Sequence, residues 1–465
     1  MTGHTRPARG MRDFLPEDIR RREYVASIVE RVYRAYGFEP LETPALENIE
    51  TLTGKYGEEG NKLIFKVLRR GEHEGSGETD LALRYDLTVP LARVVAEYRG
   101  VLPRFFKRYQ IQPVWRADRP ARGRFREFYQ CDVDAIGSRS MVVEAEVCSA
   151  VTDVLLGLGF EEFDVKINHR RVLAGLLTAS GVPELLHGTA LVALDKLDKI
   201  GLEGVERELR DRGVPQGPDG QWLGPWRLLL PFWDGAVDRA EANRKSIAAL
   251  RTILANDSAA LEGVSELESI LAYAATTTAG THLRFDATLA RGLSYYTGAI
   301  MEIAVADLAG SLGGGGRYDG LIGMFSGENV PACGFSLGFE RILVVMTERK
   351  MFPPGLETAA ADVMVTLFDV QGIADTLALA AELRRAGLRV DVYPEPDKLG
   401  KQFKYASSRG VRFVTVTGSD ERAQGVVTVK DMQSGQQTSI ARAEIAGWVA
   451  SHIGRGSPAA GRADV

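Results

Sequence analysis

The sequence predicts an α+β protein of two or three domains, and three observations support that prediction. At 465 residues the chain exceeds the roughly 250–300 residues at which one hydrophobic core stops growing. Two aromatic-rich segments, 104–116 and 125–136, have the composition of paired β-strands. A Pro- and Gly-rich linker, MFPPGLET (351–358), precedes a unit in which strand and helix patterns alternate.

The N-terminal part is predicted to contain a helix followed by an extended segment. Apolar residues recur at helical spacing over residues 17–36, and Gly37 follows them as a helix C-cap would. The segment FEPLETPALE (38–47) is predicted to be extended, because Pro40 and Pro44 each bias the preceding residue away from the helical region. A proline-bearing strand belongs at a sheet edge or an interface.

The two aromatic-rich segments are joined by the polar loop ADRPARGR and are expected to form a long antiparallel hairpin. With the helix and strand patterns around it, this hairpin forms the first part of a core, residues 1–170. Residues 171–278 are dominated by Ala, Leu and charged side chains, which indicates a mostly helical insertion. Strand signals resume afterwards, so residues 279–350 are expected to complete the core.

The C-terminal part is expected to fold separately. Beyond a linker at residues 351–359, residues 360–454 alternate strand and helix patterns, as in a small α/β domain. The predicted strands are VMVTLFD (363–369), LRVDVYP (388–394), VRFVTVTG (411–418) and VVTVKD (426–431). Residues 455–465 are expected to be a disordered tail.

Composition excludes several classes of protein. Three widely spaced cysteines imply neither a disulfide framework nor a thiolate zinc site, and the six histidines include no closely spaced pair, so no metal site is predicted. There is no P-loop motif, and no apolar run approaches the roughly 20 residues of a membrane span. We therefore expect no membrane association and a cytoplasmic location. The net charge of −5 leaves nucleic-acid binding to local basic surfaces.

The strongest chemical signal is a run of basic residues facing one acid, Asp118. Arginine side chains suit phosphate oxygens, which they bind in two-pronged fashion. The run alternates with aromatic residues such as Trp115 and Phe128, and charges inside an aromatic sheet need partners, which a polyphosphate would supply. A solvated basic loop is the alternative. The basic residues are Lys107, Arg108, Arg116, Arg119, Arg122, Arg124 and Arg126.

Three further segments are candidates for the same site. ARGLSYYTGAIMEI (290–303) places Arg291 before a β pattern. A buried strand alone would not require an arginine at that position. The glycine run 313–316 suggests a hairpin loop, although it also permits close approach of a ligand. GFSLGFERIL (334–343) carries Arg341 at a helix start, where a salt-bridged helix face is the alternative.

A fourth segment, ALRYDLTVPLAR (82–93), is expected to bind an ammonium group. It places Asp86 and Thr88 two positions apart at a predicted strand end, so both side chains would face the same way.

Together these segments resemble the motifs of class II aminoacyl-tRNA synthetases, and specifically the histidyl-tRNA synthetase family. FEPLETPALE resembles motif 1 with Pro44 as its proline, the hairpin with Arg116 resembles motif 2, and GFSLGFERIL with Arg341 resembles motif 3. RGLSYYTG and GGGGRYDGL resemble the paired histidine signatures, and LRYDLTVPLAR and ARGMRDFLPED also fit. The resemblance extends to about residue 455.

The resemblance implies a fold, a reaction and partners. The fold would be an antiparallel sheet with flanking helices, a helical insertion and a C-terminal α/β anticodon-binding domain, assembled as a homodimer through motif 1. The reaction would be ATP-dependent ligation of L-histidine to tRNA(His) through a histidyl-adenylate, with release of AMP and diphosphate and with Mg²⁺ on the outer phosphates. No general base for the transfer step is identified.

The resemblance also implies roles for individual residues. Asp86, Thr88 and Gln130 would hold the α-amino group of histidine; Asp134 and Tyr296 would recognise its imidazole, with Tyr295 lining the pocket. Arg116 and Arg291 would bracket the α-phosphate as the catalytic pair, Phe128 and Arg341 would sandwich adenine, and Arg124 would reach the outer phosphates. Ser294 stands where many relatives have an acid, and we expect activity to survive this difference.

A basic stretch in the C-terminal part is the predicted tRNA contact: Lys398, Lys401, Lys404 and Arg409, with Tyr405 among them. By itself it could be a solvated helix face, but the resemblance to an anticodon-binding domain favours contact with the tRNA backbone.

Three other functions compete. A non-catalytic regulatory paralogue of the histidine-biosynthesis pathway would usually lack the anticodon domain and the signature arginines, and both are present here. A class II ligase for another amino acid is disfavoured by RGLSYYTG and the helical insertion. A pure RNA-binding module would not need phosphate-binding arginines.

Overall fold

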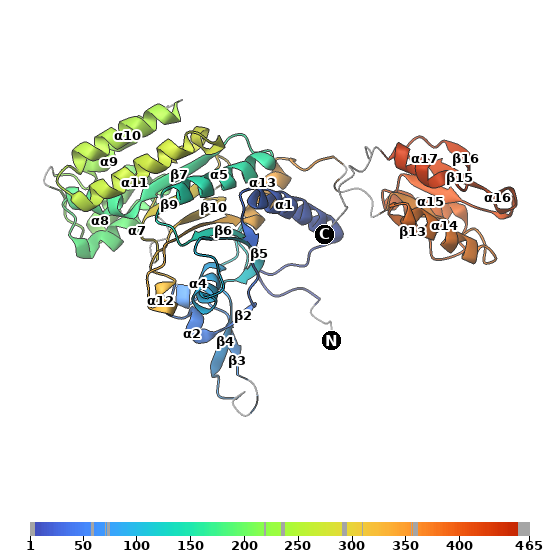
Figure 1. Cartoon of the computed structure of the whole chain (residues 1–465), viewed down its shortest axis with the longest axis horizontal. Helices are drawn as coiled ribbons and strands as arrows, with labels where there is room; N and C mark the ends of the chain where they lie inside the picture. The colour runs from blue at the N-terminus through green and yellow to red at the C-terminus, as the bar shows by residue number, and fades with distance from the viewer. Residues whose placement is uncertain are drawn as a thin grey trace. The chain divides into compact units, whose positions relative to one another are not determined.

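The structure is a computed structural model that describes residues 5–56, 60–69, 71, 75–217, 220–233, 238–290, 295–308, 310–354, 356 and 361–453. The chain divides into two compact units, Met1–Phe352 and Pro353–Val465 (Figure 1). The helical segment 171–278 belongs to the first unit. Across the described residues, every helix is too short or too polar to span a lipid bilayer.

An eight-stranded sheet forms the centre of the first unit, in the order β1-β5-β6-β11-β10-β9-β7-β8. Neighbouring strands are antiparallel except for the parallel outer pairs β1–β5 and β7–β8. The predicted hairpin is confirmed as β5 and β6. The strands are β1 (Glu39–Pro40), β5 (Phe106–Trp115), β6 (Glu127–Ile136), β7 (Asp164–His169), β8 (Leu283–Phe285), β9 (Ala299–Ala304), β10 (Gly313–Arg317) and β11 (Ala332–Gly338).

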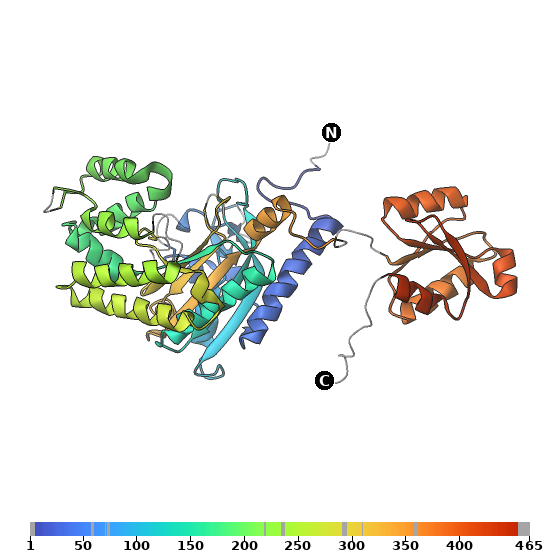
Figure 2. The same cartoon turned by 90° about the horizontal axis from the view of Figure 1, so that it is seen from above.

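One face of this sheet is covered by helices α1 (Pro16–Ala35) and α5 (Val142–Gly157), seen beside α13 (Phe339–Glu348) in Figure 2. Tyr33 of α1 and Val151 of α5 share an apolar cluster with Val133 of β6. Because side chains alternate along a strand, the neighbours of Val133 point to the opposite face. That face carries the polar residues described below.

A smaller sheet, β2-β4-β3, lies beside the main one. Its strands are β2 (Leu46–Asn48), β3 (Lys66–Leu68) and β4 (Thr79–Leu83), and the short helices around it are α2 (Ile49–Leu52), α4 (Thr88–Glu97) and α12 (Gly323–Ser326). Leu52, Val89 and Leu321 form a second apolar cluster here.

The segment 171–278 is helical and shares the core of the first unit: Trp226 and Leu250 lie in the same apolar cluster as Phe285 of the sheet. Side chains of Asp238 and Asp257 accept backbone N–H groups at the starts of α10 and α11, as N-caps do. The helices are α6 (Arg170–Ala179), α7 (His187–Leu194), α8 (Leu197–Asp211, kinked at Gly201), α9 (Gly224–Leu229), α10 (Arg239–Ile253) and α11 (Ser258–Ala274), with 3₁₀ turns η2 (Glu184–Leu186), η3 (Leu230–Phe232) and η4 (Thr278–Thr281).

The second unit is a five-stranded sheet in the order β13-β12-β14-β15-β16. The four predicted strands are confirmed, whereas β16 is an addition to them: QTSIA is polar and exposed except at Ile440. The strands are β12 (Val363–Val365), β13 (Val390–Val392), β14 (Phe413–Val416), β15 (Val426–Asp431) and β16 (Gln437–Ala441). The helices are α14 (Ile373–Arg385), α15 (Leu399–Ser408), α16 (Ser419–Gln424) and α17 (Ile445–His452).

Candidate active site

The polar face of the main sheet forms the floor of a cleft. On β6, Gln130, Asp132 and Asp134 alternate with buried apolar residues and therefore point the same way. Across the β5 register their partners are Gln112, Gln110 and Arg108, and across the β11 register they are Gly338, Ser336 and Gly334. The small residues of β11 leave this floor open. A Cβ on Gly334 would lie 1.8 Å from Asp134 Oδ1, so only glycine fits there.

The glycine run 313–316 is strand β10 inside the sheet, so the expectation of a hairpin loop is wrong. A Cβ on Gly315 would lie 2.2 Å from a neighbouring carbonyl oxygen, whereas one on Gly314 would meet its nearest atom at 3.4 Å. Gly314 also lines the cleft. Gly315 thus allows the neighbouring strands to pack closely, and Gly314 leaves the floor of the cleft open.

The cleft contains two cavities of about 350 and about 990 Å³ that share much of their lining. Phe128, Gly314, Glu302 and Arg341 are on the wall of the smaller cavity, and Asp86, Thr88 and Asp134 on the wall of the larger. The structure brings together Asp86, Thr88, Arg116, Arg124, Phe128, Gln130, Asp134, Tyr295, Tyr296 and Arg341. Arg291 and Ser294 lie outside the described residues.

Arg116 follows β5 and is held at the centre of the cleft. Its Nε donates to the Tyr85 carbonyl oxygen at 2.9 Å and its Nη2 donates to Gln130 Oε1 at 3.3 Å. Its guanidinium also lies 4.3 Å from the ring centre of Tyr85 and 5.1 Å from that of Phe128. These contacts fix the guanidinium on the boundary between the two cavities, both of which it lines.

Asp86 is buried, and its Oδ1 accepts hydrogen bonds from the Tyr56 hydroxyl at 2.9 Å and from the Val89 N–H at 3.1 Å. Burial raises the pKa of this carboxyl group. The predicted strand end is wrong, because Thr88 begins helix α4 and the strand β4 ends at Leu83. Asp86 and Thr88 still line the same larger cavity. They do so because the chain turns into α4 between them, and not because side chains alternate along a strand.

Two buried carboxylates, Asp132 and Asp134, lie beside the buried Arg108. Arg108 Nη2 is 2.8 Å from Asp134 Oδ2 and 3.8 Å from Asp132 Oδ2, and the Tyr318 hydroxyl donates to Asp134 Oδ1. Burial raises the pKa of Asp132 to about 7, against the opposing effect of Arg108. One cation shared by two acids gives this end of the larger cavity an acidic character.

The basic residues between Lys107 and Arg126 have different environments, and only some of them line the cleft. Arg108 pairs with Asp134, and Lys107 pairs with Glu146 at 2.9 Å, so both are already paired with protein carboxylates. In the loop, Arg124 Nη2 lies 3.3 Å from Asp118 Oδ1, and both residues line the two cavities. Consecutive side chains of a strand point to opposite faces of the sheet, so Lys107 and Arg108 have different partners.

Arg341 stands in the first turn of α13 and donates from Nη1 to the Ser311 carbonyl oxygen at 2.5 Å. Its neighbour Glu340 points to helix α1 and binds Arg22 at 2.8 Å. The salt-bridged helix face therefore exists at Glu340, while Arg341 lines both cavities.

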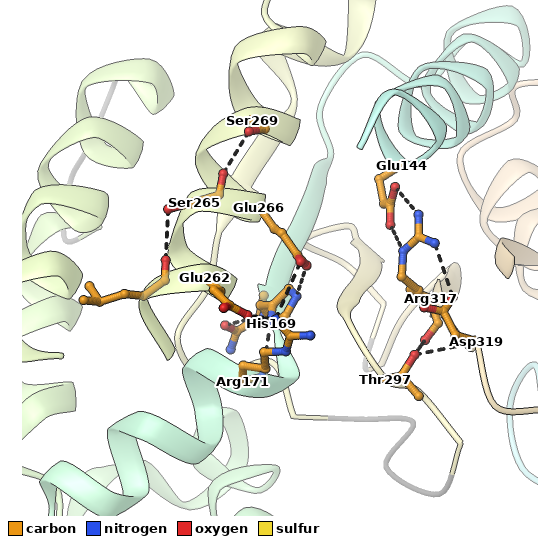
Figure 3. A network of polar contacts seen from close by, with 12 residues as sticks. Glu144, His169, Arg171, Glu262, Ser265, Glu266, Ser269, Thr297, Arg317 and Asp319 are labelled. Atoms are coloured by element: carbon orange, nitrogen blue, oxygen red, sulfur yellow. Dashed lines mark hydrogen bonds and ion pairs between the residues drawn. The ribbon is translucent and has the colours of Figure 1, made fainter. Parts of the chain in front are cut away.

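Tyr295 and Tyr296 pack edge to face, with ring centres 4.9 Å apart. The segment behind them is anchored by two backbone bonds: Thr297 N–H donates to the Arg317 carbonyl at 2.7 Å, and Arg170 N–H donates to the Gly298 carbonyl at 3.0 Å. Figure 3 shows Thr297 beside Arg317, whose guanidinium is held by Glu144.

Sequence reasoning assigned no role to several side chains of the larger cavity, among them Tyr56, Asp132, Tyr318 and Ser336. Period-two alternation from Gln130 and Asp134 would have indicated Asp132. Tyr318 and Ser336 lie in the segments GGGGRYDGL and GFSLGFERIL, which carry the family resemblance, whereas Tyr56 comes from a segment without a motif.

On the second unit, Lys398, Lys404 and Arg409 are exposed at helix α15 and its ends. Lys401 is also exposed but pairs with Asp397 at 2.9 Å. The Arg409 guanidinium lies 6.0 Å from the centre of the Tyr405 ring. A basic helix face is therefore present.

An antiparallel sheet whose polar face joins buried carboxylates to arginines, together with a separate α/β unit, is the arrangement of a class II aminoacyl-tRNA synthetase. Comparison with known families defines the class further. Residues 10–342 match the family model described as Histidyl-tRNA synthetase, and residues 362–452 match the Anticodon binding domain. The chain belongs to the histidyl-tRNA synthetase family and is an aminoacyl-tRNA ligase.

Individual relatives agree. The histidine–tRNA ligase of Cytophaga hutchinsonii is 41% identical over 94% of this chain and 97% of its own, and that of Gloeobacter violaceus is 42% identical over 93% and 95%. The crystal structure of the histidyl-tRNA synthetase from Nostoc sp. matches with a TM-score of 0.81 at 31% identity, covering 97% of this chain and 100% of that one.

Proposed function

We propose that the cleft activates L-histidine with ATP to form histidyl-adenylate and diphosphate, and then transfers the histidyl group to the 3′ end of tRNA(His), releasing AMP. The observation that carries this proposal is the distribution of charged and aromatic side chains over two cavities that share part of their lining. The buried carboxylates of Asp86, Asp132 and Asp134 line the larger cavity alone, Phe128 lines the smaller cavity alone, and Arg116 and Arg341 line both. A cationic amino acid and a polyanionic nucleotide would meet at Arg116.

The larger cavity is the proposed histidine site. Asp86 would bind the α-ammonium group with Thr88 and Gln130, because a buried carboxylate needs a compensating positive charge. Asp134 and Tyr296 would hydrogen-bond the imidazole, and Tyr295 would line the pocket. Amino acids that lack these donors would leave buried polar groups unpaired, a penalty that reaches about 10⁴-fold or more.

The smaller cavity is the proposed nucleotide site. The Phe128 ring and the Arg341 guanidinium would enclose adenine, and Arg124 would bind the outer phosphates. Arg341 is held for this task by its bond to the Ser311 carbonyl.

The first step then depends on positioning and charge. The histidine carboxylate attacks the α-phosphorus, a phosphorus–oxygen bond forms, and the bond to diphosphate breaks. Negative charge accumulates on the phosphoryl oxygens, where Arg116 stabilises it from one side and Arg291 is proposed to do so from the other. In the second step a ribose hydroxyl of the terminal adenosine of the tRNA attacks the adenylate carbonyl, and AMP departs.

Mg²⁺ is the proposed metal. Among the described residues there is no cluster of three or more His, Cys, Asp or Glu side chains able to hold a metal ion. A cation carried by the ATP phosphates would meet carboxylates of the smaller cavity, among them Asp118 and Glu302. When bound there, it neutralises charge on the departing diphosphate.

We also propose that the protein works as a homodimer in the cytoplasm and that the exposed basic face of α15 contacts tRNA. The motif 1 resemblance of residues 38–47 and the family of the second unit support these points. Sedimentation equilibrium would test the dimer, for which a monomer at micromolar concentration is the contradicting result.

Amino-acid-dependent ATP–pyrophosphate exchange with each of the twenty amino acids tests the proposed reaction. Exchange with histidine alone, lost in Arg116→Ala and Arg291→Ala, is the expected result. Arg99→Ala is the matched control, since Arg99 is exposed and pairs with the exposed Glu328. Exchange with another amino acid would reassign the pocket, and no exchange would favour a regulatory paralogue.

A further inference from the structure

The N-terminal segment packs against the returning arm of the motif 2 hairpin. Arg126 N–H donates to the Gly10 carbonyl oxygen at 2.8 Å, and Met11 N–H donates to the Ala8 carbonyl at 2.9 Å. Gly10 has φ of +84°, and a Cβ there would lie 2.8 Å from Arg126 Cγ. The turn therefore requires glycine, and Arg12 follows it two residues later.

Arg12 touches two residues of the smaller cavity at once. Its guanidinium carbon lies 3.3 Å from the ring centre of Phe125, so the planar group is stacked on that ring. Its Nη2 donates to Glu340 Oε2. Phe125 and Glu340 both line the cavity and come from different elements, the motif 2 arm and the start of α13. Arg12 therefore bridges the two elements that carry Phe128 and Arg341.

Glu340 would remain paired without Arg12. Arg22 of helix α1 donates from Nη1 to both carboxylate oxygens of Glu340, at 2.8 and 2.9 Å. The Phe14 ring lies against both guanidiniums, 4.9 Å from that of Arg12 and 4.1 Å from that of Arg22. Loss of Arg12 thus leaves no unpaired buried carboxylate, and the fold should tolerate it. What would be lost is the link to Phe125.

We infer that Arg12 is a positioning residue of the nucleotide site, which holds the motif 2 arm and the start of α13 at the separation that ATP requires. The inference rests on the proposed placement of ATP in the smaller cavity. Arg341 directly follows Glu340, so tethering Glu340 fixes the helix turn that presents Arg341. Stacking on Phe125 holds the motif 2 arm three residues before Phe128. A site fixed in advance does not spend binding energy on ordering its walls.

Steady-state pyrophosphate exchange by Arg12→Ala, Arg12→Lys and the control Arg99→Ala tests this inference. For Arg12→Ala we expect the KM for ATP to rise about tenfold, equivalent to about 1.4 kcal/mol, with the KM for histidine unchanged. Arg12→Lys should be intermediate, because lysine keeps the charge for Glu340 but lacks a planar group to stack on Phe125. Arg99→Ala should match the wild type.

Two further measurements separate the possible failures. Equilibrium dialysis with ATP alone should show the same tenfold weakening in Arg12→Ala, whether or not exchange is detected. If the wild type binds ATP but does not exchange, the proposed reaction fails and the positioning role stands. An unchanged affinity for ATP in Arg12→Ala, or equal rises in both KM values together with a lower melting temperature, would overturn the inference.

Discussion

Glu144 of α5 and Arg317 of β10 form a two-pronged ion pair inside the first unit, with Arg317 Nε and Nη2 at 2.6 and 2.8 Å from the carboxylate oxygens. Both residues are buried, and Arg317 Nη1 also donates to the Ser138 carbonyl at 3.0 Å. The backbone oxygen of Arg317 accepts from Thr297, next to Tyr296 in the cleft. The pair therefore supports the wall of the histidine site from behind.

Breaking this pair should be costly. Glu144→Gln removes the two-pronged carboxylate from a buried guanidinium, which keeps only Asp319, 3.3 Å from its Nη1, and we expect a loss of about 3 kcal/mol in the free energy of unfolding of the first unit. Glu146→Gln is the control on the same helix, because Glu146 pairs with Lys107 at a partly exposed position and should cost about 1 kcal/mol or less. Urea denaturation measures both. Similar values for the two variants would contradict the prediction.

Asp132 should make stability fall as pH rises. Burial raises its pKa from an ordinary 3.8 to about 7, with Arg108 opposing and Asp134 and Asp86 assisting the rise. Between these values the folded state binds more protons than the unfolded state, so the free energy of unfolding decreases with pH. Asp132→Asn removes this effect.

We therefore expect Asp132→Asn to gain stability relative to the wild type between pH 5 and pH 8, with the difference levelling off above pH 7. Urea denaturation at three pH values measures it. The neighbouring Ser336→Ala variant keeps the carboxylate but removes a hydrogen bond that lowers its pKa, so its decline in stability should extend to higher pH than in the wild type. A constant difference between Asp132→Asn and the wild type across this range would show that Asp132 is ionised throughout.

Trp226 of α9 ties the helical insertion to the strand that leads toward the histidine signature. Its indole N–H donates to the Ala287 carbonyl oxygen at 2.8 Å, and the side chain is fully buried. Trp226→Phe should lower the free energy of unfolding by about 1–3 kcal/mol, since it leaves a buried carbonyl without its donor. Trp222→Phe removes a comparable bond to Val214 at a partly exposed site and should cost less. Equal losses would argue against the role of burial.

Lys404 should contribute to tRNA affinity through charge alone. If it contacts a phosphate, Lys404→Ala should weaken binding and reduce the slope of log affinity against log salt by about one, while Lys404→Arg should keep both. Lys401→Ala should have a smaller effect, because Asp397 already neutralises that ammonium group. Filter binding over a range of salt concentrations measures the slopes. An unchanged slope in Lys404→Ala would remove this residue from the tRNA interface.

Residue patterns predicted much of this molecule. The hairpin β5–β6 follows from aromatic and β-branched composition, the helical segment from its Ala and Leu content, and the second unit from alternating strand and helix signals. The placement of Asp86, Arg116 and Arg341 in one cleft was expected from motif resemblance, and the structure brings them together. Their individual roles stay predictions.

The errors have a common cause. The glycine run 313–316 suggests a hairpin loop because four glycines permit any turn, yet it belongs to a strand with neighbours on both sides. Arg108 was grouped with phosphate-binding residues, yet it is buried against Asp134. In both cases the deciding partner lies outside the local sequence.

By itself the sequence determined the elements whose signals are local: strand alternation, helical periodicity, the linker, and the motifs that indicate histidine activation. The tertiary structure alone decided which faces meet. Strand order places β11, which follows the insertion, beside β6, which precedes it, and places β10 on the far side of β11. Ser336 and Gly314 therefore line the same cavity as Asp132 and Arg116. Side-chain direction alternates by local geometry, but burial and charge pairing depend on distant strands, which supply the partners that buried polar groups need.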